Sequence, residues 1–443
     1  MPTIREIPEI AGLDAKTALV RIPQELDIPL TSRARNLIDT PAFRRLASIK
    51  QLGLVSLVYP AANHTRFEHS LGVYRLALLC LRRLSFDPRF ADIVSPADAE
   101  HLIAAALLHD LGHWPFCHPI EDIQLPSVPR HELFANSFIL EEEVADVLRD
   151  DWRINPRDVV TLLSEKPNDP ARRILANLLS GPIDIDKMDY LSRDSLHAGV
   201  PYGRNFDQNR LIGSLCLNEA GDGLAMSEKG KTAAEMMVFA RYVMFSEVYW
   251  HHAVRSATAM FQRAFYLLHG SLDMDGLFRQ TEPVVISELM HAAGETGAKD
   301  LLDGLFGRSR RLYKRLREYN LSNENEIYQR LARRPYPQLA ACSDQLADTA
   351  SRALGCRIAP HEILIDAPPV AREVEFNVDV FDPKRKTYRR LDQASPVVLA
   401  LAHDQFDDYV KRVRIFAHPR VVDRLIDHKH LSKMVTEAID FLE

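Results

Sequence analysis

Apolar side chains recur at helical spacing through the first half of the chain. Residues 71–79 and 102–108 each carry them three and four positions apart, the period of one face of an α-helix. Thr31 and the Thr40–Pro41 pair predict two earlier helix starts, because threonine caps a helix N-terminus and proline is tolerated in the first turn. We therefore expect a mainly α-helical core.

The pattern changes at residues 207–230, which alternate weakly and contain a turn cluster of Asn218, Gly221, Asp222 and Gly223. Such a segment predicts a β-hairpin. A long helix is expected from about Thr232 to His269, followed by further helices that reach Leu331.

Pro335 and Pro337 mark a break, and short β-rich stretches follow at residues 363–365, 373–380 and 413–416. The chain is therefore expected to divide into an extended leader, a helical core with the hairpin inserted in it, and a small α+β C-terminal region. The predicted bounds of these three parts are residues 1–30, 31–335 and 336–443.

Charge and composition narrow the classes of protein. The chain has 55 Lys and Arg against 61 Asp and Glu, a net charge of −6, which argues against broad non-specific binding to nucleic acid or anionic membranes. No apolar run approaches the roughly 18–20 residues of a membrane span, and no signal-peptide core is present. Five scattered cysteines without a C-x-x-C pair favour the reducing cytoplasm. Cys117 is interpreted as a small packing residue.

Candidate chemistry gathers between residues 64 and 194. His109 and Asp110 are adjacent at the end of an apolar helix, His69 lies on the preceding helical segment, and residues 184–189 supply more carboxylates. Two imidazoles and two carboxylates from separate helices can surround one divalent ion and leave positions for water and a phosphate. Such an ion lowers the pKa of its water and neutralises phosphate oxygens.

The alternative is that these histidines belong to the core, since a single His-Asp pair is common and a histidine on an apolar face usually has a structural role. The density of histidines opposes this alternative. His109, His113, His118 and His131 lie in one short stretch that Gly112 and Pro115 interrupt. This density favours a functional site.

Five short motifs follow one another along the chain: Arg66–Val73, His109–His113, Pro115–His118, His131–Glu132 and Asp186–Tyr190. In this order they resemble the HD-superfamily deoxynucleoside triphosphate triphosphohydrolases, which include bacterial dNTPases and the human SAM- and HD-domain dNTPase. The resemblance covers roughly residues 38–260 and implies a helical HD-domain bundle.

The resemblance implies four metal ligands: His69, His109, Asp110 and Asp186. His118 is similar to the family's catalytic histidine, which donates a proton to the leaving 5′ oxygen, a role that suits the ordinary pKa of histidine. His113 and His131 match histidines that contact phosphates or order the attacking water, and Glu132 would orient them. Glu121 stands where relatives often have an aspartate.

The resemblance also implies eight substrate-binding residues: Gln51, Leu52, Arg66, Lys187, Tyr190, Asp194, Arg241 and Tyr249. In the family the first two close over the sugar and disfavour a ribose 2′-hydroxyl, and the next two grip the phosphates. The third pair lies near the sugar and its 3′-hydroxyl. Arg241 and Tyr249 sit at the spacing of a phosphate-binding arginine and a sugar-packing tyrosine; the alternatives are a solvated helix residue and a core residue.

The expected reaction is hydrolysis at the α-phosphorus, which releases the nucleoside and inorganic triphosphate. One alternative keeps the metal site but acts on another nucleotide: a ribonucleotide, a monophosphate or a signalling nucleotide. Another is a nucleotide sensor or nucleic-acid-binding protein that uses the basic residues of segment 308–317, for which a solvated helix face is the favoured interpretation. The ligand set accepts manganese, iron, magnesium, nickel or zinc.

One family element is missing. Many members carry an Asp-Pro-[Ile/Val]-His-Gly stretch before the first helix, where regulated members bind an activating nucleotide. Residues 21–30 lack the histidine and glycine, so the sequence leaves open whether a nucleotide activates the protein. The resemblance implies a homo-oligomer, either a dimer or a tetramer, for which a dimer is the first expectation.

Overall fold

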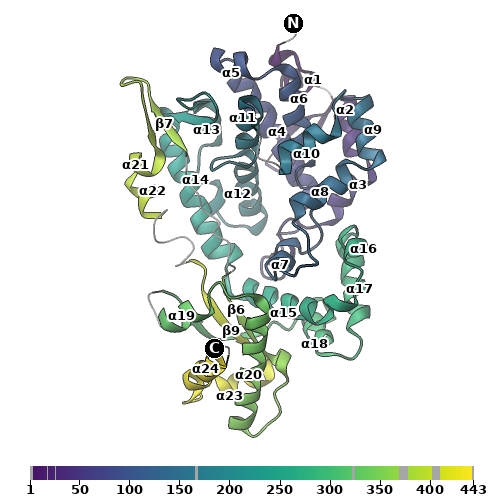
Figure 1. Ribbon diagram of the computed structural model, residues 1–443, viewed down its shortest axis with the longest axis vertical. Helices are drawn as coiled ribbons and strands as arrows, with labels where there is room; N and C mark the ends of the chain where they lie inside the picture. The colour runs from purple at the N-terminus through teal and green to yellow at the C-terminus, as the bar shows by residue number, and fades with distance from the viewer. Residues whose placement is uncertain are drawn as a thin grey trace.

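The computed structural model describes residues 3–16, 18–24, 26–164, 168–321, 325–368, 378–401 and 410–441. Helices dominate, as predicted, and small sheets accompany them (Figure 1). The helices of the first half occupy the upper part of the view, while α15, α20 and α24 lie in the lower part. The predicted mainly α fold, with a hairpin and an α+β C-terminal region, is confirmed.

The helices of the first half range from four residues to 19, and the caps predicted for two of them are present. Thr31 Oγ1 accepts a hydrogen bond from the Ala34 backbone N–H at 3.2 Å, and Thr40 Oγ1 accepts one from Phe43 at 3.4 Å. The helices are α1 (Pro8–Ala11), α2 (Ser32–Ile38), α3 (Pro41–Arg45), α4 (Arg66–Leu84), α5 (Pro88–Ile93), α6 (Pro96–Leu108), α7 (Cys117–Glu121), α8 (His131–Ile139), α9 (Glu142–Asp150), α10 (Pro156–Ser164), α11 (Pro170–Ser180), α12 (Ile185–Ala198) and α13 (Gln208–Ser214).

The prediction of one long helix over residues 232–269 is wrong, because this segment forms two helices. α14 (Lys231–Met244) ends in a π-helical turn over Phe245–Tyr249, and α15 (His252–Leu268) follows. The backbone N–H of Trp250 donates to Phe245 O at 2.8 Å. Apolar residues keep their helical spacing through the break, so the sequence gives no sign of the π-helical turn. Such turns are often found at functional sites.

The remaining helices belong to the second half of the chain and reach Leu331 and beyond, as expected. They are α16 (Met274–Phe278), α17 (Glu282–Ala293), α18 (Gly297–Phe306), α19 (Asn325–Leu331), α20 (Tyr336–Leu354), α21 (Leu391–Ala394), α22 (Pro396–Ala400), α23 (Pro419–Leu425) and α24 (Leu431–Asp440).

The strands form three small sheets. β1 (Leu19–Ile22) pairs with β2 (Leu26–Pro29) in a hairpin, so that the first 30 residues, expected to be extended, hold this hairpin and α1. The predicted hairpin is β3 (Leu215–Leu217) and β4 (Leu224–Ser227).

The hairpin β3–β4 is extended by strands from the C-terminal region. β7 (Asp379–Asp382) runs parallel to β4, and β8 (Thr387–Arg390) pairs with β7. Residues 373–377 of the strand predicted over 373–380 lie outside the described residues. Pairing between distant segments completes this sheet.

The third sheet has the order β5 (Lys314–Tyr319), β9 (Val413–Ala417) and β6 (Ile363–Asp366), which confirms the strands expected at 363–365 and 413–416. The prediction of a solvated helix face over residues 308–317 is wrong at the end of that segment, because residues 314–317 belong to the strand β5. Three arginines hold the Glu318 carboxylate at this sheet, namely Arg315, Arg412 and Arg414.

Two groups of buried apolar side chains hold these elements together. The larger runs through the helices from α2 to α18, and the smaller packs α20 and α24 against the β5–β9–β6 sheet. Among the residues that the structure describes, no helix is long and apolar enough to span a bilayer.

Candidate metal centre and substrate cavity

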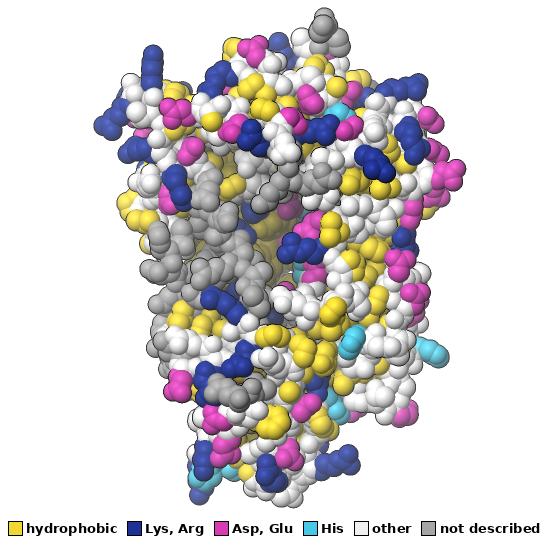
Figure 2. Space-filling view, in the orientation of Figure 1, with side chains coloured by type: hydrophobic (Ala, Val, Ile, Leu, Met, Phe, Trp, Pro, Cys, Tyr) yellow, Lys and Arg dark blue, Asp and Glu magenta, His cyan; other side chains and the backbone are white. Residues whose placement is uncertain are grey.

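A cavity of about 550 Å³ lies among the helices of the large core, a volume typical of small-molecule sites. Residues from α4, α7, α8, α10, α11, α12, α14, the π-helical turn and α15 line it, together with residues of the segments 50–55 and 109–116. The space-filling view shows a hollow near the middle of the molecule (Figure 2). Every residue predicted for the site lines the cavity except His69, which is buried but belongs to the floor of the cavity through its contacts with His109 and Asp186.

The floor brings together the four predicted metal ligands. His69 Nε2 lies 3.0 Å from Asp186 Oδ1 and 3.2 Å from His109 Nε2. Asp110 places one carboxylate oxygen 3.5 Å from His109 Nε2 and the other 3.9 Å from His69 Nε2. Three helices therefore converge on one small volume: α4, the end of α6, and the first turn of α12.

The orientation of the two imidazoles fits a cation. His69 Nδ1 lies 2.8 Å from Asp189 Oδ2, and His109 Nδ1 lies 3.0 Å from the carbonyl oxygen of Ala106. Both partners are acceptors, so each Nδ1 donates a hydrogen bond away from the cavity. The two Nε2 atoms are left facing each other at 3.2 Å, with the Asp186 carboxylate 3.0 Å from that of His69, so nitrogen and oxygen donors converge on one point. The residues thus fit a divalent metal ion, for which histidine and carboxylate are ordinary ligands.

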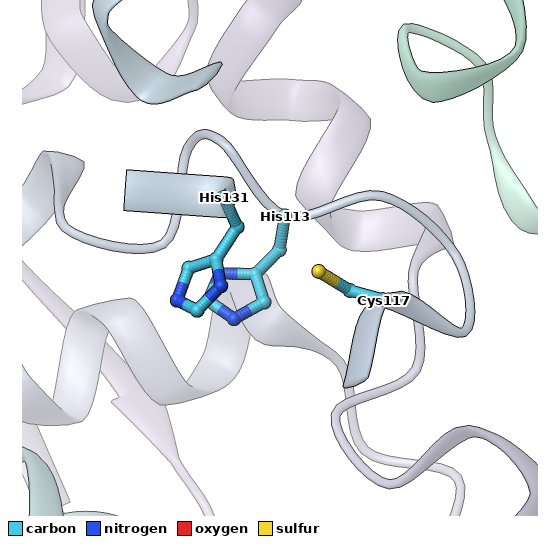
Figure 3. Close-up of side chains that lie close together, drawn as sticks. All are labelled: His113, Cys117 and His131. Atoms are coloured by element: carbon cyan, nitrogen blue, oxygen red, sulfur yellow. The ribbon is translucent and has the colours of Figure 1, made fainter. Parts of the chain in front are cut away.

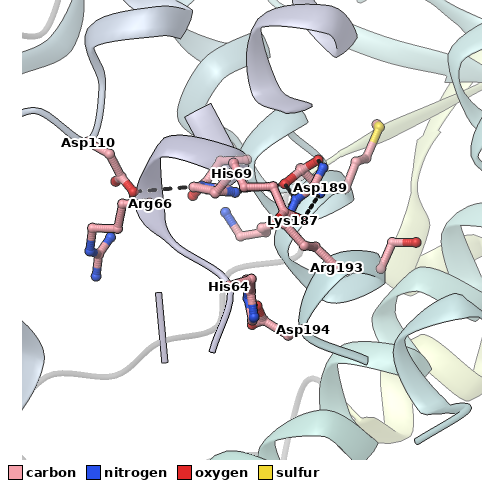
Figure 4. Close-up of polar contacts among 12 residues, drawn as sticks. His64, Arg66, His69, Asp110, Lys187, Asp189, Arg193 and Asp194 are labelled. Atoms are coloured by element: carbon pink, nitrogen blue, oxygen red, sulfur yellow. Dashed lines mark hydrogen bonds and ion pairs between the residues drawn. The ribbon is translucent and has the colours of Figure 1, made fainter. Parts of the chain in front are cut away.

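Asp189 orients His69, and this role was missed in the sequence although the residue belongs to a quoted motif. Arg193 donates to both Asp189 oxygens at 2.8 and 2.7 Å and also to Glu68 at 2.6 Å (Figure 4). Burial opposes ionisation of Asp189, but Arg193 and His69 outweigh it and lower its pKa to about 2. A side chain at Gly72 would clash, because its Cβ would lie 1.9 Å from Asp189.

Three further histidines form a group above the floor. His113 Nδ1 lies 3.0 Å from Asp110 Oδ1, and its ring lies 3.8 Å, centroid to centroid, from that of His131. Glu121 accepts hydrogen bonds from His131 Nδ1 at 2.9 Å and from the His131 backbone N–H at 2.8 Å. His118 Nδ1 lies 3.6 Å from the same carboxylate, and 62% of the His118 side chain is exposed.

Burial, together with Arg66, holds the pKa of His113 well below its ordinary value. Burial opposes charge on Glu121 as well, but His118 and His131 outweigh it and lower the pKa of that carboxyl. Glu121 is therefore an anion between two histidines, a position that the sequence indicated only by its spacing.

Arg66 and Lys187, which are expected to bind the phosphates, each already donate hydrogen bonds within the protein. Arg66 donates to Asp110 Oδ2 at 2.7 Å, and its buried Nε has no hydrogen-bond partner among the described residues. Lys187 Nζ donates to Asp184 Oδ2 at 2.5 Å and to Gly181 O at 3.0 Å. Arg241 is only 8% exposed, which excludes the alternative of a solvated helix residue.

The residues expected at the sugar form a linked group. Asp194 accepts from Tyr249 Oη at 2.6 Å, and its other oxygen lies 2.8 Å from His64 Nε2. Tyr249 therefore has a polar partner and is not a simple core residue. Gln51 Oε1 is buried without a hydrogen-bond partner and Gln51 lines the cavity beside Leu52. Tyr190 also lines it, while His64 was missed because only the fold brings it to Asp194.

Two family models match the chain where the site lies and beyond it. An HD domain matches residues 66–194, and an HD-associated region matches residues 206–434. The chain belongs to the HD-domain phosphohydrolase superfamily. All four candidate metal ligands of this HD phosphohydrolase fall within the HD match.

An uncharacterized protein of Methanocaldococcus jannaschii is 31% identical over 85% of this chain and 74% of its own length. The deoxynucleoside triphosphate triphosphohydrolase SAMHD1 of Gallus gallus is 30% identical over 66% of this chain, but the match spans only 54% of the chicken protein. A crystal structure of a hypothetical protein from Aquifex aeolicus superposes with a TM-score of 0.71 at 27% identity, over 92% of this chain and 98% of the other.

Proposed function

We propose that this HD phosphohydrolase converts deoxynucleoside triphosphates into deoxynucleosides and inorganic triphosphate. One observation carries the proposal: a single cavity joins the metal-compatible floor, two cationic side chains, the histidine group and the sugar-binding candidates. The relationship to SAMHD1 supports the same substrate class. His69, His109, Asp110 and Asp186 would hold a divalent ion, which supplies positive charge to phosphate oxygens and activates water when bound.

The protein side chains have separate roles in this proposal. Arg66 and Lys187 stabilise negative charge on the phosphate oxygens, and the buried Arg66 Nε supplies a donor without a partner in the part of the chain that the structure describes. His113 and His131 hold phosphate oxygens, and Glu132 orients this pair.

The reaction breaks the bond between the α-phosphorus and the 5′ oxygen. Water attacks the α-phosphorus and releases a proton to solvent, while the 5′ oxygen leaves as a hydroxyl, taking its proton from His118, which solvent then reprotonates. Desolvation within the cavity opposes charge on His118, but the Glu121 carboxylate outweighs it and raises the pKa of His118 above its ordinary value. This shift favours the protonated form that a proton donor needs.

Sugar selection is assigned to the Gln51 end of the cavity. The buried Oε1 of Gln51 accepts no hydrogen bond within the described residues, and a buried acceptor without a partner is costly. A deoxyribose hydroxyl would satisfy it. Asp194 and Tyr249 already bond to each other, so they form a preorganised polar edge against which the sugar packs, together with Tyr190.

The proposal is tested by product analysis. Metal-free protein is loaded separately with manganese, iron, magnesium, nickel or zinc, and each sample is incubated with each of the four dNTPs and four NTPs. Chromatography should show deoxynucleoside and triphosphate from dNTPs alone. Monophosphate and pyrophosphate would contradict the proposed bond cleavage, and turnover of NTPs at equal rates would contradict sugar selection. A His109→Ala sample controls for contaminating phosphatases.

A further inference from the structure

A second group of donor side chains lies on the wall of the same cavity. His113, Cys117 and His131 each offer a ligand atom, and these atoms all lie within 4.8 Å of one another. Figure 3 shows the Cys117 sulfur directed towards the imidazole of His113, and the His131 ring lying over the His113 ring. The three residues come from the loop after α6, the start of α7 and the start of α8. None belongs to the metal-binding floor.

Packing alone does not account for this arrangement. Cys117 is buried, as expected of a packing residue, but it lines the cavity together with both histidines. His118, Glu121 and His131 form a second group of donors at equally short range. Five candidate ligands therefore surround the mouth of the cavity beside the floor.

The chemical nature of the donors separates the two positions. The floor offers only imidazole and carboxylate, which many divalent metals accept, whereas a thiolate selects softer ions such as zinc. Tetrahedral zinc with bonds of about 2.3 Å to sulfur and 2.0–2.1 Å to nitrogen spaces its ligands about 3.3–3.6 Å apart. The ligand atoms of His113, Cys117 and His131 lie up to 4.8 Å apart, so side-chain rotations that move them by about 1 Å bring them to this spacing. Glu121 or water can complete the tetrahedron.

We propose that His113, Cys117 and His131 form a zinc-binding site distinct from the HD metal centre, and that zinc bound there inhibits the enzyme. Binding replaces the S–H bond of Cys117 by a sulfur–zinc bond, and the proton leaves to solvent through the cavity. Inhibition follows because the two histidines are withdrawn from the substrate phosphates. The inhibition rests on the proposed function, but the binding site does not.

Cobalt(II) serves as the probe for binding, because only a thiolate ligand gives an intense sulfur-to-cobalt charge-transfer band, and the floor contains no sulfur. The band should appear on titration of metal-free protein, disappear when zinc is added, and be absent from Cys117→Ser. The double variant Cys216→Ser/Cys356→Ser removes the two half-buried cysteines and should retain the band. No band in the wild type, or a band in Cys117→Ser, would overturn the site.

A measurement on the wild type covers the case in which Cys117→Ser does not fold. X-ray absorption of protein with bound zinc should show a sulfur neighbour at about 2.3 Å, and its absence would overturn the proposal.

Inhibition is measured on manganese-loaded enzyme. Cys117→Ser should keep its turnover in the absence of zinc but require at least about tenfold more zinc for half inhibition, since loss of a ligand costs at least as much as loss of a supporting residue. Equal zinc sensitivity would exclude the inhibitory role. If no dNTP is turned over at all, the proposed function fails while the cobalt titration still decides the site.

Discussion

The floor and the mouth of the cavity both contain histidines, but the protein holds them differently. On the floor, His69 is 1% exposed and its Nδ1 is fixed by Asp189, which Arg193 fixes in turn. At the mouth, 62% of the His118 side chain is exposed, and its nearest carboxylate oxygen is 3.6 Å away. The floor is oriented before any ligand arrives, whereas His118 has freedom to move.

This difference matches two kinds of chemistry. A metal ion needs several ligands fixed at once, and supporting hydrogen bonds set their direction. A proton donor must meet an oxygen whose position changes during the reaction, and its hydrogen bonds often tighten only when substrate is bound. We therefore expect variants of the floor to act through metal content and variants of the mouth to act through turnover.

Loss of a floor ligand should have the largest effect. His109→Ala should lower kcat at least about 10³-fold, because metal catalysis contributes several kcal/mol to the barrier, and metal analysis should show reduced metal content. His101→Ala is the matched control, since His101 lies on α6, the helix whose C-cap is His109, and its nearest carboxylate, Asp158, is 3.9 Å away. Full metal content and activity in His109→Ala would contradict the role of His109 as a metal ligand, and with it the contrast between the floor and the mouth of the cavity.

His118→Ala should separate the mouth from the floor. Removal of a general acid lowers kcat by about 10²–10⁴-fold, while metal content and affinity should equal those of the wild type. Single-turnover kinetics and metal titration on the same sample check both statements. Loss of metal from this variant would mean that the mouth and floor form one unit.

Local signals predicted much of the fold. The caps at Thr31 and Thr40 are set by neighbouring residues, and both appear as expected. The break between α14 and α15 was missed because the apolar period continues through the π-helical turn. The partner strands of the β3–β4 hairpin come from the far end of the chain, and short-range patterns contain no information about such pairing.

The site shows the same limit. The floor ligands could be predicted from the sequence because they lie in recognisable motifs, and the fold places them within reach of one ion. The supporting groups Asp189, Glu121 and His64 act through partners on other segments. Their roles depend on tertiary contacts, which no motif spacing reveals.

Asp189→Asn tests whether the floor depends on its support. The amide keeps the shape of the carboxylate but not its charge, so His69 loses its fixed orientation and Arg193 loses its ion pair. Metal affinity should fall about 10–100-fold, and excess manganese should restore much of the activity. A metal titration gives the affinity, and a thermal melt controls for loss of stability. Unchanged affinity would show that His69 is oriented by packing alone.

Glu318→Gln should have the smallest effect on the site and provides a baseline for stability. Burial opposes charge on Glu318, but Arg414 and Arg412 outweigh it and lower its pKa to about 2, from an ordinary value of 4.5. Its stabilisation is therefore full above the ordinary pKa and is lost as the pH falls towards 2. The substitution should cost about 1–3 kcal/mol of unfolding free energy at pH 7 and progressively less below pH 4.5.

Denaturant titrations at several pH values measure this cost, and metal titration should give the affinity of the wild type. A pH-independent cost would show that Glu318 contributes by packing and not by charge. A change in metal affinity would instead show that the small core and the HD centre are coupled, in which case effects at the floor and the mouth could not be assigned to those regions alone.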